Sequence, residues 1–199
     1  MRPMSRAIAA FILVLPCLAT LTAHAQATPT ASQRFRLSTF GTATETYTGL
    51  NSSRNGGITA GIDLGVHSFR SIQTSIELRG TYPIGQAQID NQKNLLGGLK
   101  EAKAFGRFSP YVDILFGRGE IDYPTGFATP SGKFYYVESL SNVIATGGGL
   151  DLQVSDRLFL KADAQLQRYS TPVTDSGHLY SKPFSVGLSY RFVFRHAFP

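Results

Sequence analysis

The chain has 199 residues, a length that fits one domain with a sizeable core. Its formal net charge of +6 at pH 7 comes from basic residues scattered along the sequence. This argues against a nucleic-acid-binding protein, because such proteins gather their basic residues in a patch. The single cysteine, Cys17, excludes an intramolecular disulfide.

The first segment of the chain has the pattern of a secretory signal peptide. Arg2 and Arg6 precede an apolar run, and Ala23-His24-Ala25 has the small-x-small form of a signal peptidase site. We therefore expect residues 1–25 to be a cleaved signal peptide and residues 26–199 to form a single domain. Beyond the signal, no stretch approaches the roughly 18 consecutive apolar residues that a membrane-spanning helix needs. If the protein enters a membrane, we expect it to do so with β-strands.

Period-2 alternation of apolar and polar residues predicts a series of β-strands along the rest of the chain. In the second and third strands, one face is apolar and the other carries Asp63, Glu77 and Arg79. Alternation alone does not say which face is inside. The predicted strands are 33–47, 56–67, 71–82, 93–104, 108–120, 141–154, 157–169 and 183–194.

The connections between these strands alternate between short and long. Tight turns are expected at 68–70, 106–107 and 155–156, whereas the connections rich in Gly, Pro, Ser, Thr and Asn are 48–55, 83–92, 121–140 and 170–182. Gly106 is the first central residue of its turn and can adopt the positive φ of a type II′ hairpin. Short turns at one end, long loops at the other and an even number of strands are typical of outer-membrane barrels.

The last strand carries the motif Ser185-x-Gly187-x-x-Tyr190-x-Phe192. It resembles the C-terminal signal of bacterial outer-membrane barrels, which the barrel assembly machinery reads during biogenesis. The strand count and loop alternation resemble the small eight-stranded outer-membrane barrels of the OmpA and OmpX kind. The resemblance implies an all-β protein, an eight-stranded antiparallel up-and-down transmembrane β-barrel. It also implies a monomer in contact with outer-membrane lipid.

In such a barrel, the apolar face of residues 184–194 contacts lipid. The last strand must then pair with the first, because an open sheet edge in hydrocarbon leaves backbone groups without partners at several kcal/mol each. Eight strands leave an interior just wide enough to be filled by side chains. We therefore expect no wide pore.

Charged residues are expected to fill this interior. The turn at 106–107 places Lys100 opposite Asp113, and a three-residue turn at 155–157 places Asp151 opposite Lys161. The predicted lumen network consists of Glu77, Arg79, Lys100, Asp113, Asp151, Lys161, Asp163 and Arg191. Buried charges persist only when they are paired. The resemblance suggests that the network acts as a gate, and a static polar core is the simpler interpretation.

The connection 121–140 is the longest and is the candidate extracellular contact surface. The residues expected to form this surface are Phe127, Lys133, Phe134, Tyr135 and Tyr136. Aromatic anchors favour a protein or glycan ligand. An aromatic girdle at the membrane interface explains the same residues equally well.

The predicted role is structural or surface-binding, without catalysis, cofactor or metal. One alternative is a lipid A-modifying barrel enzyme, since Asp175, Ser176 and His178 are the residue types of a hydrolytic triad. Triad partners, however, are usually far apart in the sequence.

A second alternative is a soluble secreted barrel of lipocalin type that binds an apolar ligand. In that case Ile62, Ile76 and Leu188 face inward, and Asp63 and Glu77 face water. The C-terminal motif and the loop alternation count against this alternative.

Overall fold

The computed structural model describes residues 36–85, 89–128, 132 and 135–192. The predicted signal peptide, residues 1–25, lies outside these ranges. Among the residues described there is no helix with the length and apolarity needed to cross a membrane.

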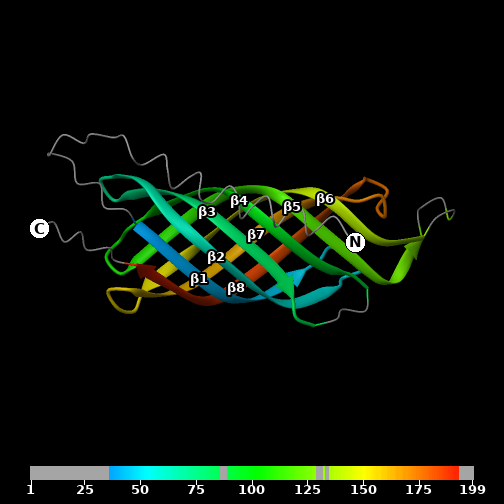
Figure 1. The fold of residues 1–199 in the computed structure, drawn as a ribbon, viewed down its shortest axis with the longest axis horizontal. Helices are drawn as coiled ribbons and strands as arrows, with labels where there is room; N and C mark the ends of the chain where they lie inside the picture. Colours follow the sequence, from blue (N-terminus) through cyan, green and yellow to red (C-terminus); the bar gives the residue numbers. More distant parts are fainter. Residues whose placement is uncertain (1–35, 86–88, 129–131, 133–134, 193–199) are drawn as a thin grey trace, which may run out of the picture. The chain divides into compact units, whose positions relative to one another are not determined.

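The described chain forms a single closed β-barrel (Figure 1). Each strand pairs antiparallel with the next, and β8 pairs with β1 to close the sheet. The predicted eight-stranded up-and-down fold is therefore confirmed. The strands are β1 Arg36–Tyr47, β2 Arg54–Phe69, β3 Ile72–Pro83, β4 Asn91–Lys103, β5 Phe108–Ala128, β6 Tyr135–Gln153, β7 Leu158–Ser170 and β8 His178–Phe192.

Side chains alternate between the interior and the outer surface of the barrel wall. In β8, Ser185 is 4% exposed and Ser189 is 6% exposed, whereas Val186 is 58% exposed. Each strand presents at least one exposed large apolar side chain on the outside: Tyr47, Ile62, Ile76, Leu99, Ile114, Ile144, Leu166 and Leu188.

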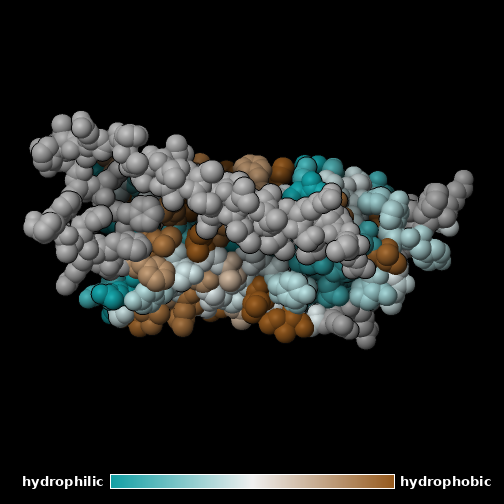
Figure 2. All heavy atoms as spheres, in the orientation of Figure 1, coloured by the Kyte–Doolittle hydropathy of each residue, from teal (hydrophilic) through white to brown (hydrophobic). Residues whose placement is uncertain are grey.

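Apolar side chains therefore line the outside of the wall, and Figure 2 shows several of them along the lower edge of the barrel. A contiguous apolar surface of this extent requires a nonaqueous environment. The barrel is thus a transmembrane barrel, and the lipocalin-like arrangement is wrong because Ile62 and Leu188 face outward while Glu77 is fully buried.

The short turns lie at one end of the barrel, which we call the turn end. Phe105 and Phe108 exchange backbone hydrogen bonds across Gly106, whose φ is 61°, as a two-residue turn requires. The amide of Val154 donates to the carbonyl of Leu158 at 2.9 Å, which closes the predicted three-residue turn.

The β2–β3 turn differs from the prediction. β2 continues to Phe69, and Arg70 adopts a positive φ of 55° in the turn that follows. The register shifts between Gly65 and His67. A bulge of this kind inserts an extra residue into one strand, so simple alternation misplaces the turn.

The opposite end, which we call the arm end, contains longer strands than predicted. Within the segment predicted as a loop, residues 121–128 and 135–140 belong to strands, because β5 extends to Ala128 and β6 begins at Tyr135. The alternation continues through this region, with Ile121 and Ser139 both buried. The turn-forming residues in the sequence obscured that alternation.

β8 also begins earlier than predicted, at His178 instead of residue 183. Pro183 lies inside the strand. There, the β7–β8 pairing passes from Ala164↔Phe184 directly to Gln167↔Ser181. A proline lacks the N–H that the ladder needs, and this strand tolerates it where pairing to β7 is interrupted.

Candidate functional site

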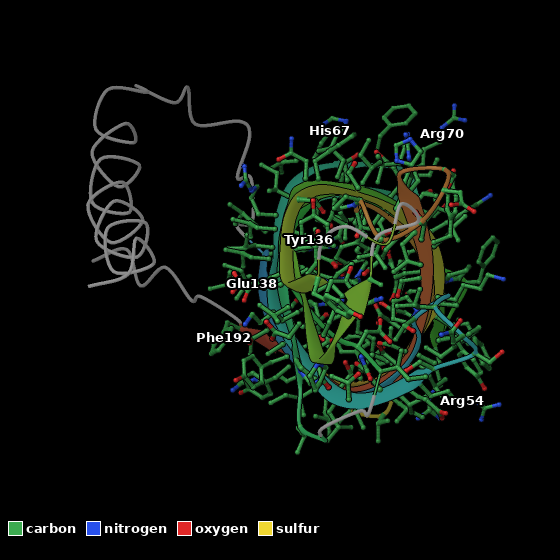
Figure 3. The ribbon with its side chains drawn as sticks, turned by 90° about the vertical axis from the view of Figure 1, so that its right-hand side faces the viewer. Arg54, His67, Arg70, Tyr136, Glu138 and Phe192 are labelled. Atoms are coloured by element: carbon green, nitrogen blue, oxygen red, sulfur yellow. The ribbon has the colours of Figure 1, made fainter. Side chains whose placement is uncertain are left out.

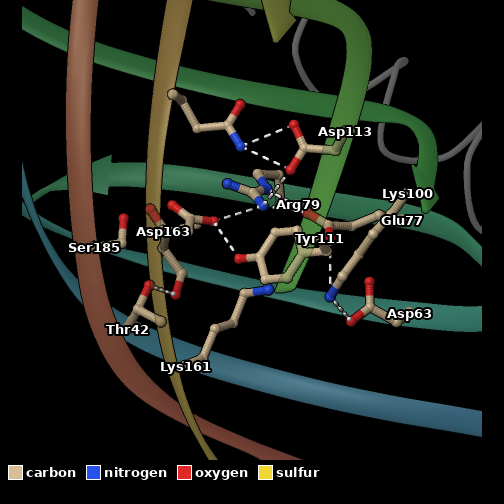
Figure 4. Close-up of polar contacts among 12 residues, drawn as sticks. Thr42, Asp63, Glu77, Arg79, Lys100, Tyr111, Asp113, Lys161, Asp163 and Ser185 are labelled. Atoms are coloured by element: carbon tan, nitrogen blue, oxygen red, sulfur yellow. Dashed lines mark hydrogen bonds and ion pairs between the residues drawn. The ribbon is translucent and has the colours of Figure 1, made fainter. Parts of the chain in front are cut away.

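The arginine Arg79 of β3 lies at the centre of the barrel interior, 2% exposed (Figure 4). Its guanidinium donates to Glu77, and its Nη2 lies 2.8 Å from Oδ2 of Asp163 and 3.6 Å from Oδ2 of Asp113. Gln165 donates from Nε2 to both oxygens of Asp113, at 2.9 and 2.8 Å. One guanidinium therefore ties together carboxylates from three strands.

Two lysines extend this cluster towards the turn end. Nζ of Lys100 lies 3.1 Å from Asp63, 3.2 Å from Asp151 and 3.8 Å from Glu77. Nζ of Lys161 lies 3.8 Å from Asp151. Both lysines are almost fully buried, so each ammonium depends on these carboxylates for compensation of its charge.

Aromatic rings complete the environment of the two lysines. The ammonium of Lys161 lies 4.1 Å from the ring centroid of Tyr111 and 4.7 Å from that of Phe40. Lys100 lies 4.0 Å from the same Tyr111 ring. Cation–π contacts of this kind stabilise a buried cation. Neither Phe40 nor Tyr111 was expected in the lumen, since alternation does not separate an inward aromatic residue from a lipid-facing one.

The structure gives both predicted register pairs, Lys100↔Asp113 and Asp151↔Lys161. Arg191 faces the interior, but it forms no ion pair with the cluster, so the predicted network is wrong in this one member. Its guanidinium lies over the ring of Phe159 at 4.3 Å. Arg191 is the second-last residue of β8 and lines the lumen at the turn end.

The cluster contains one member that the predicted network omitted, Asp63 of β2. It pairs in register with Glu77 and accepts a hydrogen bond from Lys100. The sequence could have predicted this member, because Asp63 lies on the polar face of β2. With Asp63 included, carboxylates outnumber basic groups in the cluster, whose members are Asp63, Glu77, Arg79, Lys100, Asp113, Asp151, Lys161 and Asp163.

The arm-end half of the interior is filled differently, by an apolar cluster. Its buried members are Leu50, Leu96, Leu115, Ile121, Tyr123, Val143, Ala145, Tyr169, Val173 and Leu179. The expectation of a wholly polar lumen is therefore wrong. In Ile114-Leu115-Phe116, apolar residues occupy both faces of the strand, and this break in alternation was the signal in the sequence.

Polar contacts also join two connections at the arm end. Oγ1 of Thr48 donates to Asp90 at 2.9 Å, and Nε2 of Gln92 donates to Asp90 at 3.0 Å. Burial raises the pKa of Asp90 above its ordinary value, although these hydrogen bonds oppose the shift. The contacts link the β1–β2 and β3–β4 connections above the apolar cluster.

At the arm end, β5 and β6 continue as a hairpin that we call the β5–β6 arm, residues 123–128 and 135–142. β4 pairs with β5 only as far as Asp122, and β7 pairs with β6 only from Val143. Among the residues that the structure describes, no strand pairs with this part of β5 or β6, and the end of β7 contacts the arm only at its base, where the amide of Ser170 donates to Oγ of Ser141 at 3.3 Å. The arm therefore presents two open strand edges.

The predicted contact residues fall at different places in this arm. Tyr135 is 76% exposed, whereas Tyr136 packs partly against the apolar cluster and lies over the barrel opening in Figure 3. Phe127 lies in β5 and pairs with Tyr136. Lys133 and Phe134 are outside the described residues. Val137, 68% exposed, was not among the predicted residues.

The three residues of triad type do not form a triad. The hydroxyl of Ser176 donates to the backbone carbonyl of His178 at 3.1 Å, not to its ring. The imidazole Nε2 of His178 lies 2.6 Å from the guanidinium of Arg168, so the ring contacts Arg168 and not Ser176.

One group of acidic residues lies at the base of the arm. Glu120, Asp122 and Glu138 each have a carboxylate oxygen within 4.8 Å of the other two. The ammonium of Lys93 already lies 2.7 Å from Glu120 and 3.2 Å from Asp122. A side-chain cation thus pairs with two of the three carboxylates.

No protein-family model matches this sequence, and no curated protein sequence matches it. Among solved structures, Neisserial surface protein A is 14% identical, with a TM-score of 0.50 over 79% of this chain and 97% of that chain. The chain has the fold of a small outer-membrane barrel.

Two further solved structures are less similar. Ail of Yersinia pestis, in complex with the heparin analogue sucrose octasulfate, is 12% identical, with a TM-score of 0.48 over 80% of this chain and 99% of that chain. The outer membrane enzyme PagL is 14% identical, with a TM-score of 0.41 over 78% of this chain and 99% of that chain. Function must be derived from the sites of this chain, because a fold does not determine function.

Proposed function

We propose that this protein is a non-enzymatic outer-membrane barrel whose β5–β6 arm binds an extended polypeptide at the cell surface. Residues 1–25 act as its signal peptide, and the motif from Ser185 to Phe192 is read by the barrel assembly machinery. Short turns face the periplasm in outer-membrane barrels. This orientation directs the arm to the outside of the cell.

The open edge of β6 is the observation that carries the proposal. An unpaired strand edge offers a row of N–H and C=O groups to which another strand can add. On β6, this edge runs from Tyr135 to Asn142 and contains no proline. The exposed side chains of Tyr135 and Val137 supply apolar contacts for the added strand.

The edge of β5 is less suited to pairing. Pro124 lies within it, Gly126 has a φ of 69°, and the register to β6 is irregular between Asp122 and Phe127. Proline and bulges are the devices by which proteins prevent strand addition. The arm therefore has one protected edge and one available edge.

The filled lumen supports a structural role for the barrel itself. The charged cluster around Arg79 and the apolar cluster around Leu96 occupy successive levels of the interior. Interlocked side chains of this kind favour a static plug over a gate, and they hold the wall rigid beneath the arm.

The proposal is tested with a lysine placed on the β6 edge. The purified barrel in detergent is passed over an immobilised peptide of alternating Val and Thr, and binding is measured by surface plasmon resonance. Val137→Lys should weaken binding about tenfold, which corresponds to about 1.4 kcal/mol, since a lysine on an open edge opposes strand addition.

Ile84→Lys is the matched control, because Ile84 is 70% exposed and lies in the β3–β4 connection at the same end. It should bind as the wild type does. Equal loss in both variants, or no saturable binding by the wild type, contradicts the proposed role of the arm.

A further inference from the structure

A polar cavity of about 230 Å³ opens at the turn end of the barrel. Arg36 and Ser38 of β1, Ser189 and Arg191 of β8, and Gln73 of β3 contribute to its wall. Lys100, with Asp63 and Asp151, forms its inner limit. The cavity therefore lies between the charged cluster and the space beyond the turns.

Three arginines line this cavity, and among the described residues two of them, Arg36 and Arg191, have neutral partners. Nη1 of Arg36 donates to Oε1 of Gln73 at 2.9 Å, and the guanidinium of Arg191 lies over the ring of Phe159 at 4.3 Å. All Asp and Glu residues of the chain lie within the described ranges, and none comes within 4.0 Å of either guanidinium.

Two further cations line the cavity: the guanidinium of Arg70 lies over the ring of Phe69 at 5.2 Å, and Lys100 is already compensated. Lys100 is held between Asp63 and Asp151, at 3.1 and 3.2 Å. The positive charge of Arg36 and Arg191 thus remains in excess at the mouth. A partly enclosed site of this kind concentrates anions, because low-dielectric walls screen the charges less than bulk water does.

Hydroxyl donors accompany the excess charge. Ser38 pairs in register with Arg191 across the β1–β8 seam, and Ser189 lies on the same inward face of β8. Guanidinium groups bind carboxylate and phosphate with two parallel hydrogen bonds. Serine hydroxyls can complete the coordination of the remaining oxygens.

We propose that this cavity binds a small oxyanion, a phosphate or carboxylate group, between Arg36 and Arg191. The cavity is smaller than the roughly 300–1,000 Å³ of pockets for drug-sized ligands. It therefore admits a free ion or the anionic end group of a larger molecule. In the proposed orientation the ligand enters from the periplasm, and binding itself does not depend on the arm.

The test uses the folded, purified barrel in a zwitterionic detergent, titrated with inorganic phosphate or malonate in an isothermal calorimeter. Saturable binding by the wild type is expected, and Arg191→Gln should weaken it about tenfold or more, the loss of one charge-assisted contact. Arg36→Gln should have a similar effect. Preference for phosphate or for malonate identifies the chemistry of the natural group.

Arg157→Gln is the matched control, because Arg157 is an exposed arginine of the β6–β7 turn at the same end and does not line the cavity. It should bind the anion as the wild type does. Absence of saturable binding to both anions, or an equal loss in the Arg157 variant, overturns the proposal. Retained heat-dependent migration in electrophoresis establishes that each variant is folded.

Discussion

Individual buried charges are the residues on which the interior of this barrel most depends. Arg79 contacts three carboxylates, whereas Lys161 has one carboxylate at 3.8 Å and two aromatic rings. Removing one partner from a buried ion pair leaves an uncompensated charge in a medium of low dielectric constant. The effect should be larger where more carboxylates depend on the same cation.

Arg79→Met should therefore lower the free energy of unfolding by about 3–5 kcal/mol. Lys161→Met should lower it by less, because the cluster loses one weaker contact. Urea unfolding of the barrel refolded into lipid vesicles measures both. Lys182→Met, at an exposed lysine of β8, is the control and should change the midpoint little. Equal midpoints for all three would mean that the cluster is hydrated.

The sequence correctly predicted which residues of neighbouring strands lie opposite each other where a short turn set the register. The two-residue turn at Gly106 was enough to place Lys100 opposite Asp113, because each step along paired strands is then determined. Contacts across the lumen, such as Arg79 with Asp163, involve strands that are not neighbours. Their meeting depends on the tilt and stagger of the strands, which no local pattern encodes.

At the scale of the element, the closing seam between β1 and β8 has its own requirement. A Cβ added to Gly187 would lie 2.1 Å from the carbonyl oxygen of Gly41 and 2.5 Å from Cα of Thr42. The glycine of the assembly motif is therefore also needed for close approach of the two backbones. Hydroxyls continue the seam, since Thr44 bonds to Ser185 at 2.9 Å.

Gly187→Ala should destabilise the barrel by about 1–3 kcal/mol, the usual cost of overpacking, and should slow folding into vesicles. Gly41→Ala is the control on the same seam, because no atom lies within 4 Å of its added Cβ. Time-resolved electrophoresis without boiling follows the folding of both. Normal folding of the Gly187 variant would show that the seam can relax.

Element lengths were the weakest part of the sequence prediction. β5 and β6 run into the segment assigned as the longest loop, and the arm that they form was not anticipated. Gly, Pro and Ser in that segment indicate a turn when read locally. Pairing between β5 and β6 outweighed these preferences, because it gives partners to backbone groups on the facing edges of the two strands.

At the scale of the whole molecule, the two filled levels of the interior predict a closed barrel. The purified protein should migrate faster before boiling than after it in SDS electrophoresis, since a closed sheet resists unfolding by detergent. In planar bilayers it should give no steady conductance steps, because charged and apolar clusters occupy the lumen in series.

The double variant Glu77→Ala with Arg79→Ala tests whether the apolar cluster alone keeps the lumen closed. It removes the centre of the charged cluster and leaves the apolar cluster around Leu96 and Tyr169 in place. This double variant should therefore remain closed. Steady conductance in the wild type would contradict the plug, and conductance in the double variant would mean that the apolar cluster alone does not seal the lumen.

By itself, the sequence determined the fold class, the order of the strands and the ends at which short and long connections gather. It did so because period-2 alternation and turn residues are local properties, and closure in lipid leaves few arrangements. The tertiary structure alone decided the apolar half of the lumen, the separation of Arg191 from the charged cluster and the open edge of β6. Each of these features depends on the relative lengths of the strands and on their tilt to the barrel axis. Packing across the barrel sets both.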